Sequence, residues 1–122
     1  MRYMFLIYGR EGATDTRTDE QRQQAIAAHW SVMDRAREAG VFRGAEPLYP
    51  TTTATTIRQV PGGKPVVTDG PFAETKEQLA GYYIMDCKDL DEAIGWALQL
   101  PLGCRGGEGS IEIRPIAELP PR

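Results

Sequence analysis

The sequence is poor in the residues that build metal sites and disulfide frameworks. It has one histidine and two cysteines in 122 residues, and Cys87 and Cys104 do not form a C-x-x-C pair. Because a structural zinc ion normally takes four nitrogen or sulfur ligands, we expect no zinc site made by this chain alone. A metal bound mainly by carboxylates stays open, but we predict no metal and no cofactor. Two cysteines also make no disulfide framework.

Long apolar runs and an excess of basic charge are missing as well. The apolar N-terminal stretch ends after residue 8, whereas a membrane helix needs about 20 apolar residues and a signal peptide needs a cleavage site. The net charge of −3 argues against nucleic acid as a partner. We therefore expect a cytoplasmic protein that binds neither membrane nor nucleic acid. Its length and the absence of repeats or linkers predict one domain over residues 1–122.

Two helices are predicted from capping boxes. Thr18–Gln21 begins the first, which should run to Ala39 and end at Gly40; Asp89–Glu92 begins the second. Helical periodicity places apolar residues on one arc of each helix. The first arc contains Ala25, Ile26, Ala28, Trp30, Val32, Met33, Ala36 and Ala39, and the second contains Leu90, Ala93, Ile94, Ala97 and Leu98.

Strands are predicted on both sides of these helices. They cover residues 2–8, 41–48, 52–60, 64–68, 79–87 and 111–116. The order β-α-β-(hairpin)-β-α-β predicts an α+β, ferredoxin-like βαββαβ sandwich with an added hairpin and both helices on one sheet face. Residues 2–8 and 79–87 are apolar on both strand faces, so we expect a second copy to cover the other face in a C2 homodimer.

His29 and Asp69 are the candidate catalytic residues. A neutral imidazole suits general acid–base chemistry, and a carboxylate partner would orient it. His29 could equally be a core histidine or an interface residue. Asp69 begins a stiff Asp-Gly-Pro turn, which could aim its carboxylate into a pocket or only use it to hold the turn.

Arginines and tyrosines on the strands are candidate substrate-binding residues. Arg58 and Arg114 could clamp an anionic substrate, although pairing with carboxylates such as Glu112 across the dimer is favoured. Tyr82 and Tyr83 face opposite sides of their strand, so one should lie in the core and the other should line the cavity or interface. The pattern leaves open which is which.

Two other polar segments attract attention. Glu74–Glu77 is a charged cluster that reads first as a solvated face. Gly103–Gly109 is glycine-rich but lacks the spacing of a phosphate loop and precedes a strand, so we reject a phosphate site there. Cys104 in this loop has no histidine near it in sequence that could activate its thiol.

The segment Thr68–Leu79, with Gly81-Tyr82-Tyr83, resembles the signature of the DGPF subgroup of the YCII-related domain family. Further segments match in order: Arg2–Met4 with Ile7-Tyr8, Ala54–Arg58, Asp89–Ala93 and Ile111–Pro115. The resemblance covers nearly the whole chain. It implies the dimeric α+β barrel form of the ferredoxin-like fold.

The resemblance also implies functions. Some members are thought to be small enzymes with a His–Asp dyad, whose histidine lies eleven residues before the glycine that ends the first helix. In this chain, His29 lies eleven residues before Gly40. Other members often have Asp-Pro after the second helix, where this chain has Leu100-Pro101, so Asp69 would have to supply the carboxylate. The subgroup is also associated with extracytoplasmic-function sigma factors.

Three functions follow from these observations. The first is a cofactor-independent acid–base enzyme of the isomerase, dehalogenase or lyase type, in which His29 moves a proton on a small organic molecule. The second is a ligand-binding or regulatory module tied to a sigma factor, without turnover. The third is a dimer that binds no ligand, because fold alone does not decide function.

Overall fold

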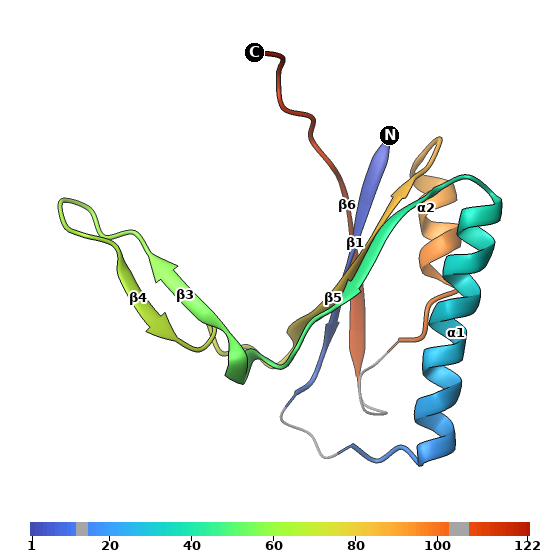
Figure 1. Cartoon of the computed structure of the whole chain (residues 1–122), viewed down its shortest axis with the longest axis horizontal. Coiled ribbons are helices and arrows are strands. Elements are labelled where there is room, and N and C mark those ends of the chain that lie inside the picture. Colours follow the sequence, from blue (N-terminus) through green and yellow to red (C-terminus); the bar gives the residue numbers. More distant parts are fainter. Residues whose placement is uncertain (12–14, 103–107) are drawn as a thin grey trace.

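The computed structural model describes residues 1–11, 15–102 and 108–122 (Figure 1). Its elements in chain order are β1 (Arg2–Gly9), α1 (Asp19–Glu38), β2 (Phe42–Pro47), the 3-10 helix η1 (Thr51–Thr53), β3 (Thr55–Arg58), β4 (Val66–Asp69), β5 (Gln78–Asp86), α2 (Leu90–Ala97) and β6 (Gly109–Pro115). Four strands form an antiparallel sheet in the order β2-β5-β1-β6, and β3 and β4 form a separate hairpin. This α+β arrangement is compatible with the predicted ferredoxin-like sandwich.

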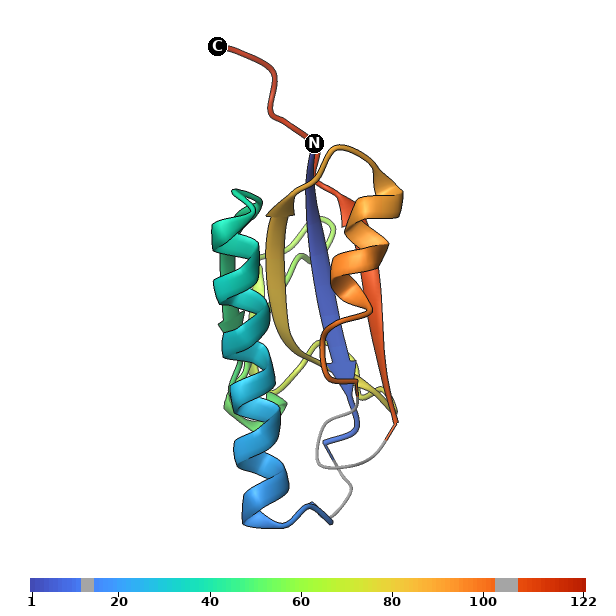
Figure 2. The same cartoon turned by 90° about the vertical axis from the view of Figure 1, so that its right-hand side faces the viewer.

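Both helices lie on one face of the four-stranded sheet, and the β3–β4 hairpin extends away on the opposite side (Figures 1 and 2). The core lies between the sheet and the helices. Phe5 and Met85 are fully buried there, from the central strands, together with Val32 of α1 and Ala93 of α2. Among the described residues, no helix covers the other face (Figures 1 and 2).

Alternation along the central strands produces these two faces. Tyr3 and Phe5 point into the core, whereas Met4 and Leu6, which alternate with them, are only partly buried. The register pairs Met4 with Ile84 and Leu6 with Tyr82, which places these four side chains together on the face without helices. We call Met4, Leu6, Tyr82 and Ile84 the open sheet face.

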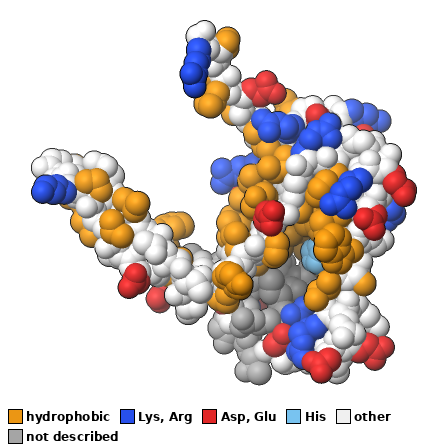
Figure 3. Space-filling model, viewed as in Figure 1, with side chains coloured by type: hydrophobic (Ala, Val, Ile, Leu, Met, Phe, Trp, Pro, Cys, Tyr) orange, Lys and Arg blue, Asp and Glu red, His pale blue; other side chains and the backbone are white. Residues whose placement is uncertain are grey.

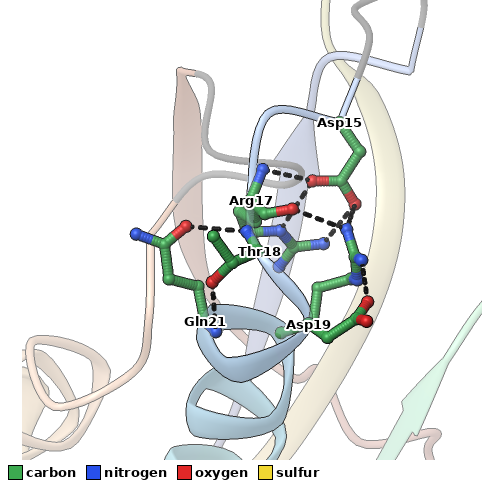
Figure 4. A network of polar contacts seen from close by, with 6 residues as sticks. Asp15, Arg17, Thr18, Asp19 and Gln21 are labelled. Carbon is green, nitrogen blue, oxygen red and sulfur yellow. Dashed lines mark hydrogen bonds and ion pairs between the residues drawn. The ribbon is translucent and has the colours of Figure 1, made fainter.

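The capping box predicted at Thr18 is confirmed (Figure 4). The Gln21 amide donates to the Thr18 hydroxyl at 3.1 Å, and the Thr18 amide donates to the Gln21 side-chain oxygen at 2.9 Å. Asp15 anchors the preceding turn, because its carboxylate accepts two side-chain hydrogen bonds from Arg17 at 3.1 Å. These bonds lower the pKa of Asp15 to about 2. At the other end, Gly40 ends the helix with φ +77°.

Residues 51–53 are a tight helical turn, so the strand predicted over 52–60 is wrong at its beginning. Hydroxyl groups explain the difference. The Thr53 hydroxyl donates to the Pro50 carbonyl at 2.7 Å, and Thr51 donates through both its amide and its hydroxyl to the Glu11 carboxylate. Such side-chain bonds compete with a strand ladder.

The helical arcs are only partly buried, contrary to the simplest reading of their periodicity. Val32 and Ala36 are in the core, but Ile26 and Trp30 are 58% and 56% exposed. On α2, Ala93 and Ala97 are buried while Leu98 is exposed. The sheet has only four strands, so its face accommodates one narrow stripe of each helix and leaves the flank of the arc uncovered.

Within the described ranges, no helix is both long and apolar enough to cross a membrane. Leu100, at the position where the resemblance implies an acid, is buried at 4% exposure and belongs to the core. Cys87 is a buried free thiol whose pKa burial raises to about 11. The glycine-rich segment predicted as a loop, including Cys104, lies outside the described residues except at its C-terminal end.

Candidate functional site

A groove of about 680 Å³ runs between α1 and the β2–β5 edge of the sheet. Its size is in the range of small-molecule sites. In the space-filling view, the histidine is visible at the bottom of a recess surrounded by hydrophobic side chains (Figure 3). We call this recess the α1 groove.

One face of α1 forms the wall of the α1 groove. Its lining residues are Ile26, His29, Trp30, Met33 and Arg37. They are spaced at i, i+3, i+4, i+7 and i+11, which places them on one side of the helix. This face lies beside the stripe that enters the core, so the same helix serves both packing and the groove.

The sheet forms the floor of the groove, with Ile7, Ala45, Gly81 and Tyr83 among its residues. The register shifts once between Ile7 and Tyr8 and once between Phe42 and Gly44, beside this floor. Such irregularities redirect side chains and are frequent next to functional sites.

Gly81 allows β2 to lie close to β5 at the groove. A Cβ atom at position 81 would lie 2.9 Å from the Glu46 carbonyl oxygen and 3.3 Å from the Pro47 Cα. Both are backbone atoms that could move only with the strand. The glycine of the Gly81-Tyr82-Tyr83 segment is therefore required by this close approach.

His29 and Tyr83 form the polar centre of the α1 groove. Nδ1 of His29 lies 2.6 Å from the Tyr83 hydroxyl oxygen, and the two rings are stacked with centroids 5.9 Å apart and an interplanar angle of 21°. Either the hydroxyl donates to an unprotonated Nδ1 or the Nδ1–H group donates to the hydroxyl oxygen, depending on the tautomer. This bond connects the helix wall to the sheet floor.

Burial favours the neutral form of both groups. It lowers the pKa of His29 below 6.5 and raises the pKa of Tyr83 to about 12. At neutral pH the pair is therefore an uncharged imidazole and an uncharged phenol. An uncharged imidazole can accept a proton, and a phenol can donate a hydrogen bond to a substrate oxygen.

The structure places Asp69 in the hairpin, away from the residues that line the α1 groove. It lies at the end of β4, opposite Thr55, and is exposed. Gly70 follows with φ +96° and accepts a 2.7 Å hydrogen bond from the Thr56 hydroxyl. Arg58 donates to the Phe72 carbonyl at 3.1 Å. In this chain the Asp-Gly-Pro-Phe segment thus closes the base of the hairpin.

The other candidate residues are divided between the two sheet faces. Tyr83 is buried at 4% exposure and bonds to His29, while Tyr82 lies on the open sheet face and reaches the rim of the groove. Arg114 lies on β6, and its Nε donates to Glu112 of the same chain at 3.1 Å. The structure therefore brings His29 and Tyr83 together, turns Tyr82 to the other sheet face although it contributes to the lining, and leaves Arg58 and Arg114 outside the lining.

The charged cluster near residue 76 makes surface contacts. Lys76 pairs with Glu108 at 3.3 Å, and the Ser110 hydroxyl donates to Glu77 at 3.0 Å. In the part of the chain that the structure describes, no three His, Cys, Asp or Glu side chains gather as they would around a metal ion.

Sequence reasoning did not single out Arg37, Trp30 or Glu46 as site residues. All three line the α1 groove. Arg37 and Trp30 could have been found by extending the helical spacing, since Arg37 is eight residues after His29 and Trp30 is four residues after Ile26, and residues four and eight positions apart lie on one side of a helix. Glu46 gives no such signal, because its role depends on how β2 pairs with β5.

Comparisons with known proteins match nearly the whole chain. The sequence model of the YCII-related domain family matches residues 1–120. An uncharacterised protein of Rhizobium meliloti (strain 1021) is 40% identical over 121 residues, which cover 99% of this chain and 96% of that protein.

Proposed function

The chain belongs to the YCII-related domain family, and we propose that it is a cofactor-independent acid–base enzyme acting on a small organic molecule in the α1 groove. The carrying observation is the 2.6 Å contact between His29 and Tyr83 inside a largely apolar recess. The reaction would be of the isomerase, dehalogenase or lyase type, in which a proton leaves one substrate atom.

His29 and Tyr83 would divide the work between them. When Nδ1–H donates to the Tyr83 oxygen, Nε2 is unprotonated and accepts the substrate proton, while the Tyr83 hydroxyl donates to the oxygen on which negative charge develops. The lowered pKa of His29 keeps the base uncharged at neutral pH. The raised pKa of Tyr83 keeps its hydroxyl proton in place.

Proton transfer can be tested without knowing the natural substrate. A panel of carbonyl compounds is incubated in deuterium oxide, and NMR follows the exchange of acidic C–H groups with solvent. We expect catalysed exchange with one class of compound and a loss of about 100-fold or more in His29→Gln. The matched control is Asp69→Asn, which changes a polar side chain outside the groove. Exchange that is the same in wild type and His29→Gln would refute the proposal.

A ligand-binding module without turnover is the second candidate. It is favoured by the pairing of His29 with a tyrosine, because a carboxylate would raise the basicity of the imidazole more strongly. Tight binding of a compound that undergoes no exchange would support this candidate. The association with an extracytoplasmic-function sigma factor stays a prediction, tested by co-purification from cells.

We propose further that two copies join through the open sheet face in a dimeric α+β barrel. Met4, Leu6, Tyr82 and Ile84 are apolar or aromatic and have no helix above them. Exposed apolar faces of this kind usually bind a partner, and C2 dimers are the commonest oligomers. Sedimentation should show a dimer in wild type and a monomer in Leu6→Glu, with Leu98→Glu on α2 as the control. A monomeric wild type would refute this.

A further inference from the structure

The α1 groove has a positively charged residue, Arg37, at one end of its helix wall. Arg37 lies beside Phe42 at the start of β2, with its guanidinium carbon 4.6 Å from the ring centroid. Glu46, near the other end of β2, is exposed and pairs with Tyr82. Its side chain therefore points to the open sheet face and not toward α1.

From the position of Arg37 on the same wall as Ile26, Trp30 and Met33, we infer that the α1 groove binds a small carboxylic acid with an elongated apolar body, whose carboxylate contacts Arg37. The inference rests on the proposed function and extends it to a ligand class. Arg37 stands at one end of the helix wall, so its contact with the carboxylate would fix the direction in which such a ligand lies. His29 lies eight residues before Arg37, about 12 Å along the helix axis, so the apolar body would lie past the His29–Tyr83 pair.

The guanidinium of Arg37 is held in place, but not all of its N–H groups are used by the contact that it makes. The Phe42 ring supports one side of its guanidinium, and Nη1 contacts the Asp34 carboxylate at 3.3 Å on the surface. Its five N–H groups exceed what this single contact can use. A planar guanidinium stacked on an aromatic ring is a suitable fork for a carboxylate.

The surroundings explain why one local cation is required. The protein has a net charge of −3, so its overall field does not attract anions. The helix wall about two to three turns before Arg37 is apolar, with Trp30 and Ile26 more than half exposed. An apolar ligand body would cover these two side chains and remove their surface from water.

Binding of octanoate, octanol and octylamine tests the inference, because these probes share one apolar chain and differ in charge. Binding is followed by the NMR shifts of the His29 imidazole. We expect octanoate to bind at least about tenfold more tightly than octanol and octylamine, and Arg37→Gln to remove that preference. Arg37→Lys should retain part of it. Arg35→Gln is the matched control, since Arg35 is in the same helical turn, contacts Gln99 and does not line the groove.

Each result decides the inference separately from the proposed function. Loss of the octanoate preference in Arg37→Gln but not in Arg35→Gln supports the carboxylate site. Equal binding of octanoate and octanol, equal effects of the two variants, or no binding of any probe overturns it. In all of those cases, the dependence of proton exchange on His29 remains a separate test of catalysis.

Discussion

The α1 groove and the β3–β4 hairpin are built from the sequence in opposite ways. The groove collects residues that lie far apart in the chain, such as Ile7, His29 and Tyr83. The hairpin is closed at its base by the short Asp69–Phe72 segment. Gly70 makes the turn with a positive φ, and Arg58 donates a hydrogen bond to the Phe72 carbonyl. The comparison teaches that a conspicuous motif can specify a turn, while the residues suited to chemistry carry no local pattern.

The largest expected effect is on stability, and it differs between the core beside the groove and the hairpin. Phe5→Ala removes a fully buried ring from the core, whereas Phe72→Ala removes a ring that is 76% exposed beside the hairpin. We expect the free energy of unfolding to fall by about 3–5 kcal/mol in the first variant and to change by less than about 0.5 kcal/mol in the second. Urea denaturation measures both. Comparable losses would mean that the hairpin is covered in solution.

A second substitution tests the close approach that shapes the groove. Gly81→Ala places a methyl group against the β2 backbone at 2.9 Å, so we expect a loss of about 1–3 kcal/mol and a displaced β2. Gly95→Ala is the control, because nothing lies within 4 Å of its added Cβ in α2. That variant should be about 0.5–1 kcal/mol more stable than wild type. Thermal unfolding measures both variants. Equal changes in stability for Gly81→Ala and Gly95→Ala would contradict the close approach of β2 to β5 as the reason for Gly81.

Much of the fold could be predicted because its signals are local. The capping box at Thr18, the N-cap at Asp89, whose carboxylate accepts from the Glu92 amide, and the turn at Gly40 depend on residues within four positions, and all three are found in the structure. Strand alternation likewise gives the correct faces for Tyr3 and Met4. The added hairpin follows from its β-rich arms and the glycine turn between them, where Gly62 has φ +72°.

The candidate site was less predictable because its geometry is not local. The spacing of His29 on its helix indicates a candidate base, but its contact with Tyr83 joins residues 54 positions apart. Since the strand is apolar on both faces, its pattern could not decide between Tyr82 and Tyr83. Periodicity also marks Trp30 as apolar without showing that the sheet is too narrow to cover it.

The pH dependence of stability tests the α1 groove separately from the hairpin. The pKa of His29 is lower in the folded protein than its ordinary value of 6.5, because burial disfavours the charge. The unfolded chain therefore binds the proton first as the pH falls, and this contribution to stability is complete above about pH 6.5 and declines below it. His29→Gln should unfold with a weaker dependence between pH 6.5 and 5. Parallel curves for the two proteins would contradict the buried imidazole.

The smallest expected effect is that of Asp69→Asn, which tests whether the hairpin and the α1 groove interact. Asp69 is exposed on the hairpin and His29 bonds to Tyr83, so Asp69→Asn should keep the fold and shift the pKa of His29 by less than about 0.3 units. Tyr83→Phe is the comparison and should change that pKa clearly. NMR titration of the single imidazole measures both. A shift in Asp69→Asn that depends on protein concentration would mean that the hairpin of one copy reaches the groove of another, and a shift at every concentration would place the contact within one chain.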